Sequence, residues 1–429
     1  MSMILLLAAS LNSLSFHEIA PVRTEIVNPI HQDTFNKGGK ATKRQQGGNP
    51  TIIDGRLQFE GSSDGDRQVD PQIAVGGGYV LHGTNGGIII YDKKGTYVDG
   101  VPQREFNNGI DPKLLFDPHN HIFAFDLWTY WDKEKIKPVN ISVSETSDPR
   151  GAWNTYPVSA SHGVDGGGIG YSRKWIGYSY PGGPEQTFVM RTADLKAGKP
   201  ATVYHFAGNL GQPVYTQDPT DDLLFVELTD DEIVLTTVGE NHLGIPVVTS
   251  VAKAPHKFQY FEWPPASPMK DTEAKTASGD RNPKNLVVQS NFLWFSQTVN
   301  VNGRAGVQWH QVRLDGKFVQ DGLLSSPTTS YIETTIAVNK HKDVLVGFQE
   351  TGKDMFISAR CAWRKAKDPS GTLRPILKLA EGLAPTKGGP WGDYSSSVID
   401  GDNLSDLWTI QSVATKKGTG GTVITRIKP

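Results

Sequence analysis

The sequence predicts an all-β protein, folded as one seven-bladed β-propeller. Two observations predict it. A module of three to four short strands recurs seven times along the chain. The composition also suits short strands joined by tight turns, because 46 glycines and 27 prolines occur among the 429 residues. We expect the propeller to span residues 50–429, after a leader of residues 1–49.

The innermost strand of each module is marked by an acidic residue, two spacers and a short β-branched run. Clear copies begin at Asp70, Asp111, Asp221, Glu333 and Asp393, and looser ones at Asp165 and near Asn282. Second and third strands follow each copy, whereas fourth strands, such as Phe258–Glu262, are weaker. Turns of the form D-x-x-G, as at Asp92 and Asp148, favour hairpins between the strands.

The two ends of the chain are expected to meet in one blade. The last module reaches the C-terminus after only three strands. The stretch Thr51–Glu60 lies upstream of the first full module and reads as a spare strand. It would supply the outer strand of the last blade and leave no open sheet edge at the seam.

Composition and charge exclude several classes of protein. A net charge of −2 gives no reason to expect nucleic-acid binding. A single cysteine, Cys361, rules out an intramolecular disulfide and a cysteine metal cluster. The polar, basic stretch from His31 to Gly48 reads as a flexible tether. We expect a monomer.

The N-terminus suggests export. The apolar run Met3–Leu11 is too short to span a bilayer, and small residues at Ser13 and Ser15 fit a signal-peptide cleavage site. We therefore expect a secreted or periplasmic protein. No Lys or Arg precedes the apolar run, so a disordered or docked N-terminus is the alternative.

The links between blades pass over the face where propellers usually bind ligands. These links carry Arg67, Asn107 and Asn108, His162, Tyr215 with Gln217, Arg281 with Lys284, Tyr331, and Trp391. Aromatic rings offer platforms for sugar faces, and cations and amides hold a carboxylate, so the set favours an acidic carbohydrate as ligand. The alternative is that these are ordinary polar loop residues.

The acids at the starts of the inner strands would line the central channel. They are Asp70, Asp111, Asp165, Asp221, Glu333 and Asp393. They either cap backbone N–H groups or hold a cation, for which oxygen ligands favour a structural Ca²⁺. We expect no other cofactor. A further unusual residue is His82, on a second strand, which is either a hydrogen-bonded structural histidine or an acid/base residue.

Two segments carry a family resemblance. They are the run from Val69 to Gly109, which begins Val-Asp-Pro-Gln-Ile-Ala-Val, and the run Gly-Tyr-Ser-Arg-Lys-Trp-Ile-Gly-Tyr-Ser-Tyr-Pro-Gly-Gly from Gly170. Both resemble propeller enzymes that act on L-rhamnose α-1,4-linked to D-glucuronate in gum arabic and arabinogalactan proteins. That group contains lyases and α-L-rhamnosidases. The resemblance covers about residues 50–429 and implies a functional histidine in the first blade, which here is His82.

A uronate lyase needs three kinds of group. A cation or amide must neutralise the carboxylate, a base must take the C5 proton, and an acid must protonate the leaving oxygen. The candidates are Arg281 as clamp, His82 or His162 as base, and Tyr215 or Tyr178 as acid. The expected substrate-binding residues are Arg67, Asn108, Gln217, Lys284, Tyr331 and Trp391.

Other functions stay open at this point. A hydrolase acting on the same bond would usually need two carboxyl groups at a set separation, which the sequence does not reveal. A lyase on another uronate polymer, such as ulvan, is a further alternative. A non-catalytic propeller that binds glycans or proteins is an alternative of a different class, because this fold hosts many functions.

Overall fold

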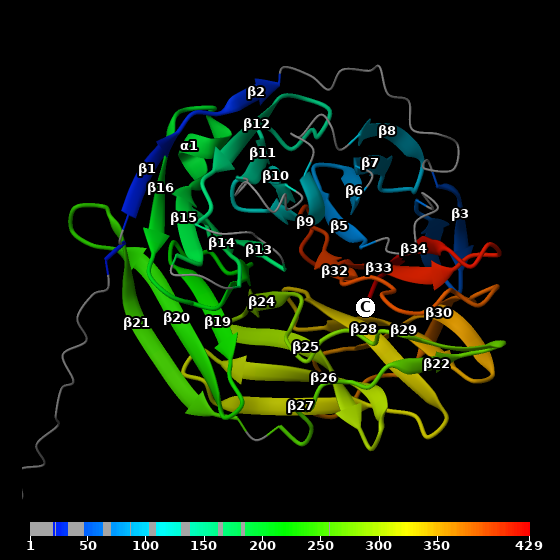
Figure 1. Cartoon of the computed structure of the whole chain (residues 1–429). Coiled ribbons are helices and arrows are strands. Elements are labelled where there is room, and N and C mark those ends of the chain that lie inside the picture. The colour runs from blue at the N-terminus through cyan, green and yellow to red at the C-terminus, as the bar shows by residue number, and fades with distance from the viewer. Residues whose placement is uncertain are drawn as a thin grey trace, which may run out of the picture.

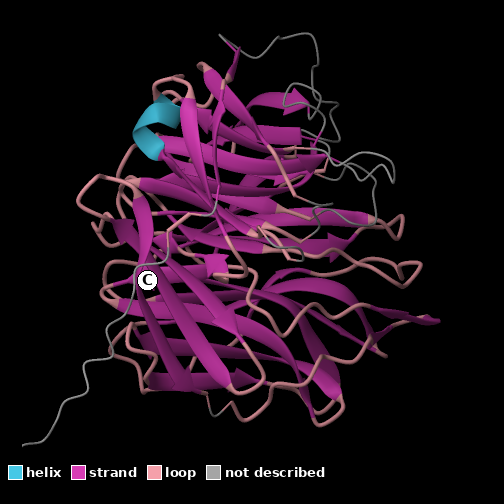
Figure 2. Cartoon of the chain, turned by 60° about the vertical axis from the view of Figure 1, so that its left-hand side comes forward, coloured by secondary structure: helices cyan, strands magenta, loops and turns pink. Residues whose placement is uncertain are grey.

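The computed structural model describes residues 20–21, 23–32, 47–62, 70–85, 87–102, 109–129, 138–161, 166–181, 185–256 and 258–429. These residues lie almost entirely in strands and loops, with one short helix, α1 (Thr192–Lys196) (Figure 2). The predicted all-β fold is confirmed. Among the described residues, no helix has the length and apolar character needed to cross a membrane.

The strands form antiparallel sheets that follow one another along the chain. The successive sheets consist of β5 (Gln72–Gly76), β6 (Tyr79–Thr84), β7 (Gly87–Asp92) and β8 (Tyr97–Pro102); β9 (Gly109–Asp117), β10 (Ile122–Thr129), β11 (Val139–Ser144) and β12 (Trp153–Val158); β13 (Gly168–Tyr171), β14 (Trp175–Ser179), β15 (Thr187–Arg191) and β16 (Ala201–Phe206); β17 (Gln212–Pro213), β19 (Leu223–Leu228), β20 (Glu232–Glu240) and β21 (Pro246–Pro255); β24 (Leu286–Gln289), β25 (Phe292–Val301), β26 (Arg304–Arg313) and β27 (Phe318–Leu324); β28 (Thr329–Val338), β29 (Val344–Gly352), β30 (Met355–Arg364) and β31 (Leu377–Ala380); and β32 (Ser396–Ile399), β33 (Leu407–Ala414) and β34 (Gly420–Ile427), joined by β4 (Arg56–Glu60) and β3 (Gly48–Ile53). A small hairpin, β22 (Ser267–Met269) and β23 (Thr272–Thr276), forms a separate two-stranded sheet that contacts β29 and β30.

The sheets are arranged around a common centre, with their first strands innermost (Figure 1). β5 contacts β9, β9 contacts β13, β24 contacts β28, β28 contacts β32, and β32 contacts β5. Between β13 and β24, the short strand β18 (Tyr215–Thr216) pairs in parallel with both, so the groups β13–β16 and β24–β27 belong to one continuous sheet. We call the face of the molecule on which the innermost strands begin the start face.

Apolar side chains fill the space between consecutive sheets. One cluster, for example, packs Phe59 and Trp408 of the last sheet against Val80 and Tyr91 of the first. Because a neighbouring sheet covers each face, the inner strands are buried on both sides and read as nearly continuous apolar runs. β5 is buried along its whole length.

The N-terminal residues join the last sheet, but not as the single strand that the sequence suggested. The stretch folds into the β3–β4 hairpin, which turns at Asp54-Gly55, where both residues have positive φ (48° and 77°). Such a two-residue Asp-Gly turn suits a tight hairpin. β4 pairs with β34, from Glu60 opposite Val423 to Leu57 opposite Arg426.

Two further strands lie upstream, where the sequence suggested only a leader. β1 (Arg23–Val27) pairs with β16, and β2 (Ile30–Gln32) pairs with β12. They add outer edge strands to two neighbouring sheets. They were not predicted because their alternation of apolar and polar residues is too short to form a recognisable pattern.

The predicted strand order was wrong for the sheet that contains β17. Asp221 precedes β19, which is the second strand of that sheet, and its carboxylate pairs with Arg173 at the surface (2.7 Å). Asp221 therefore does not belong to the channel acids. The outer strand is β21, and Phe258–Glu262 forms no strand. The inner strand, Gln212–Pro213, is too short to leave a periodic pattern in the sequence.

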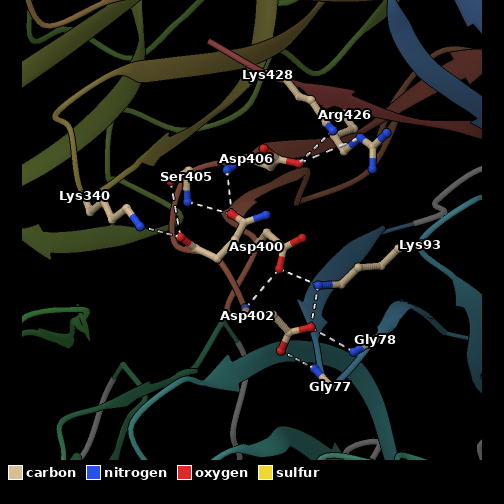
Figure 3. Close-up of polar contacts among 11 residues, drawn as sticks. Gly77, Gly78, Lys93, Lys340, Asp400, Asp402, Ser405, Asp406, Arg426 and Lys428 are labelled. Atoms are coloured by element: carbon tan, nitrogen blue, oxygen red, sulfur yellow. Dashed lines mark hydrogen bonds and ion pairs between the residues drawn. The ribbon is translucent and has the colours of Figure 1, made fainter.

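An ion-pair cluster holds the first and last sheets together on the face opposite the start face (Figure 3). Lys93 Nζ donates to Asp400 Oδ1 and to Asp402 Oδ2, both at 2.5 Å. Asp402 also accepts the backbone N–H groups of Gly77 and Gly78. The ammonium group thus stabilises a turn of the last sheet against two turns of the first.

Lys93→Met is expected to lower the free energy of unfolding by about 1–3 kcal/mol, because the buried Asp400 carboxylate loses its cation. Denaturant unfolding measures the change. Lys94→Met is the control, since Lys94 is exposed and next in sequence, and it should change stability by less than about 0.5 kcal/mol. Equal stability of the two variants would show that the cluster contributes nothing.

Candidate functional site

A cavity opens on the start face among the sheets of β13–β16, β17–β21 and β24–β27. We call it the outer cavity; its volume is about 500 Å³. That size fits a site for a small ligand or a sugar unit. Its polar lining consists of Ser179, Tyr180, Gln186, Asn209, Gln212, Glu227, Asp280, Asn282 and Lys284. Amides, hydroxyls and charges of both signs therefore face one concave surface.

A narrower pocket lies at the inner end of the outer cavity, towards the central channel. This inner pocket has a volume of about 40 Å³ and is bordered by Lys113, Tyr215, Lys284 and Tyr394. Gln212 and Lys284 line both spaces. Lys284 therefore lies at the junction between them.

The glycines Gly166–Gly168 form one wall of the inner pocket. A side chain at Gly167 would lie 2.1 Å from the Tyr178 hydroxyl. The close approach of backbone to tyrosine thus requires glycine at this position. Tyr178 is buried, and its hydroxyl has no hydrogen-bond partner among the described residues.

Two lysines flank the Tyr394 ring. Lys113 Nζ lies 2.7 Å from the ring centroid and Lys284 Nζ lies 5.6 Å from it. Lys284 also forms an ion pair with Asp280 (3.2 Å). Attraction between a cation and the ring face stabilises such an arrangement.

Buried carboxyl groups surround these lysines. Burial raises the pKa of Asp126 and of Glu333 to about 8 each, and that of Asp70 to about 6. Nearby carboxylates add to the effect, and the lysines oppose it. Clusters of titratable groups with shifted pKa values are typical of functional sites.

The channel acids have a structural role as well. Asp70 accepts the backbone N–H of Asp393 (2.7 Å) and the amide of Asn85 (2.9 Å), and Asn85 in turn accepts the backbone N–H of Asp111 (2.8 Å). This chain links three consecutive sheets by the capping that the sequence allowed as an alternative. Asp70, Asp111 and Glu333 all have positive φ (41°, 52° and 50°), a strained conformation for such residues.

The structure brings three of the predicted site residues together: Tyr178, Tyr215 and Lys284. Burial, followed by the charge of Asp126, raises the pKa of both tyrosines above the usual value, so their hydroxyls stay protonated. The sequence reasoning missed Lys113, Asp126 and Tyr394. The sequence held only weak signals for them. Lys113 and Tyr394 lie within two residues of the repeat acids Asp111 and Asp393, and Asp126 lies on a second strand.

Other predicted residues lie elsewhere. Tyr331 packs on Phe348, and Trp391 lies in a separate apolar cluster. Arg281 donates to Asp230 (2.8 Å) and to the Phe261 carbonyl (3.0 Å), so its guanidinium is engaged beside the outer cavity. Gln217 borders a small pocket at the opposite end of the channel. Arg67, Asn107, Asn108, His162 and Asp165 lie outside the described residues.

His82 is buried between the first and last sheets. Its Nδ1 accepts the backbone N–H of Ser62 at 3.3 Å, and Nε2 has no hydrogen-bond partner among the described residues. Burial lowers the pKa of His82 to about 3, so the ring is neutral. It borders neither the outer cavity nor the inner pocket. This placement favours a structural role.

His82→Ala is expected to lower the free energy of unfolding by about 2 kcal/mol or more, because it leaves a cavity at the seam between the sheets. Thermal and denaturant unfolding measure this. A variant with wild-type stability and no turnover would instead restore His82 as an acid/base residue.

No group of three or more His, Cys, Asp or Glu side chains able to hold a metal occurs within the described ranges. In the channel, the amines of Lys113 and Lys284 face the acids. Calcium binding therefore remains a prediction for the protein as a whole.

Comparison with known proteins identifies no family. No family model matches the chain, and no curated protein sequence matches it. Among solved structures, YjhT has a TM-score of 0.42 at 10% identity, covering 72% of this chain and 97% of that one. An endo-arabinase from Bacteroides thetaiotaomicron has a TM-score of 0.28 at 12% identity, covering 74% and 93%. AztD from Citrobacter koseri has a TM-score of 0.34 at 11% identity, covering 72% of each chain. Likenesses this loose assign no function.

Proposed function

We propose that this chain is a seven-bladed β-propeller enzyme that cleaves the L-rhamnose-α-1,4-D-glucuronate linkage of arabinogalactan-type glycans by β-elimination. One observation carries the proposal. Two lysines and two tyrosines converge at the inner end of a sugar-sized cavity whose lining is rich in amides. An acidic sugar needs cations for its carboxylate and amides for its hydroxyls.

The blade count is supported by the topology. Each repeat of four antiparallel strands packs on the next through an apolar cluster, and one such cluster joins the last repeat to the first. We assign the sheet pieces linked by β18 to separate blades, because β18 pairs with its neighbours only in parallel over one or two residues.

The residues suit the steps of an elimination. Lys284, at the junction of cavity and pocket, neutralises the carboxylate and so makes the C5 proton more acidic. Tyr215 or Tyr178, kept protonated by burial, donates a proton to the leaving oxygen. His162 stays the predicted base.

Hydrolysis of the same bond is the second candidate. It is favoured by Glu333, whose raised pKa of about 8 keeps the carboxyl group protonated at neutral pH, beside the exposed Asp393. Two carboxyl groups, one of them held protonated, form the pair that a glycosidase uses. A lyase acting on another uronate polymer, such as ulvan, is a further alternative, because it would need the same two lysines to neutralise its substrate's carboxylate.

We also propose that the protein is exported and acts as a monomer. The support is the apolar run near the N-terminus and a substrate that occurs outside cells. A structural Ca²⁺ in the channel remains part of the proposal, and a calcium-dependent melting temperature would support it.

The reaction is tested by incubating the purified protein with gum arabic and following ultraviolet absorbance together with free rhamnose. An unsaturated uronate that absorbs identifies the lyase. Free rhamnose without absorbance identifies the hydrolase. If no rhamnose is released, the lyase and the hydrolase proposals both fail. The protein would then be a non-catalytic propeller that binds glycans or proteins.

A further inference from the structure

Lys113, on β9, carries a buried amine. The residue is 5% exposed, and its Nζ has no hydrogen-bond partner among the described residues. The ring face of Tyr394 lies against it, at 2.7 Å from the centroid. Burying a charged amine without hydrogen bonds costs free energy, so a group that partners it on binding would be favoured.

The amine borders the inner pocket, and the pocket limits what can reach it. A volume of about 40 Å³ admits a group of the size of a carboxylate or one water molecule, but no sugar ring. The ring would stay in the outer cavity, which has about 500 Å³. Lys284 lines both spaces and so lies on the path between them.

The charges that face Lys113 come from several strands. They are Lys284 before β24, Asp126 on β10, Asp111 on β9 and Asp70 before β5. Tyr394 covers the amine, while Asp280 pairs with Lys284 and Glu333 interacts with it electrostatically. Asp393, Asp70 and Asp280 act in turn on Glu333. Burial first, and then Lys284, lower the pKa of Lys113 to about 7, against the opposing effect of the acids.

The ligand-free amine is therefore largely neutral above that pH. A carboxylate placed beside it favours the ammonium form, so the pKa rises on binding. By linkage, a proton is then taken up from solution with the ligand. The same contact gives a neutral sugar no advantage.

We propose that Lys113 anchors a carboxylate subsite, in which the acid group of a sugar enters the inner pocket between Lys113 and Lys284 and binds together with one proton. The inference deepens the proposed function and rests on it, since it takes the outer cavity as the glycan site. It makes Lys113 the residue that selects acidic over neutral sugars.

Calorimetry on the full chain tests the subsite with D-glucuronate and with D-glucose, which differs only at the acid group. Titrations at about pH 8, above the Lys113 pKa of about 7, use two buffers of different ionisation enthalpy. We expect glucuronate to bind with uptake of up to one proton, and glucose to bind at least about 10-fold more weakly. Binding without proton uptake, or equal affinity for the two sugars, would overturn the proposal.

Lys113→Met keeps most of the length of the side chain and removes the amine. It should weaken glucuronate binding at least about 10-fold and abolish the proton uptake. The control is Lys94→Met, because Lys94 is exposed on the opposite face, and it should change neither the affinity nor the proton uptake. Unchanged affinity in Lys113→Met would also overturn the proposal. If that variant does not fold, the proton uptake of the wild-type protein decides.

The outcomes separate this inference from the proposed function. Proton-coupled glucuronate binding without cleavage of any glycan would leave the subsite standing and reject the reaction. If the protein cleaves gum arabic and Lys113→Met leaves the KM unchanged, the proposed reaction stands and the carboxylate subsite is rejected.

Discussion

Replacing Lys284 by methionine is expected to lower kcat/KM on an arabinogalactan-type glycan by about 100-fold or more. Lys284 lines both the outer cavity and the inner pocket, and its partly buried ammonium pairs only with Asp280 at 3.2 Å among the described residues. Without that cation, the substrate carboxylate is not neutralised and the C5 proton stays too weakly acidic. Initial rates of rhamnose release measure the effect.

Lys340→Met is the matched control for this experiment. Lys340 is exposed on the opposite face, where its Nζ donates to the Asn403 carbonyl at 2.9 Å (Figure 3). We expect its rates to stay within about 2-fold of the wild type, because surface substitutions away from a site have small effects. If both lysine variants keep full activity, the outer cavity is not the site of the reaction.

The second large effect concerns the seam of the fold. Phe59→Ala is expected to lower the free energy of unfolding by about 3–5 kcal/mol. Phe59 on β4 is 2% exposed, its ring centroid lies 5.1 Å from that of Tyr91, and it joins the cluster between the first and last sheets. The variant would leave a cavity between the two sheets. Denaturant unfolding measures the loss.

Ile52→Ala provides the comparison on the same hairpin. Ile52 on β3 is 67% exposed, so its removal should cost less than about 0.5 kcal/mol. A Phe59 variant as stable as the Ile52 variant would mean that the N-terminal hairpin is not part of the cooperative fold.

The sequence predicted the fold well where its signal was long. Each inner strand is buried on both faces, so its sequence is a nearly continuous apolar run. Repeat acids such as Asp70 and Asp111 shortly precede these runs and therefore mark where the inner strands start. The signal failed at Gln212–Pro213, where the inner strand has two residues and no period can show. The hairpin turn was readable at Asp54-Gly55, but the flanking residues alternate so briefly that they read as one strand.

The candidate site was predicted less completely. Tyr215 and Lys284 were found because the links between blades reach the axis, and chemistry-bearing residues in such links are informative. Lys113 was missed because it follows a repeat acid inside a strand, where a lysine normally points to solvent. Asp126 was missed because its counterparts on other second strands give no pattern. Their burial depends on how several sheets converge, which no local pattern encodes.

The central claim is that an acidic sugar binds in the outer cavity with its carboxylate in the inner pocket. A crystal structure of the protein with a glucuronate-terminated oligosaccharide tests this most directly. The carboxylate is expected within hydrogen-bond distance of the Nζ atoms of Lys113 and Lys284. A sugar bound instead in the groove of about 450 Å³ beside Leu383, between β31 and β4, or at the channel end beside Gln217, would contradict the claim.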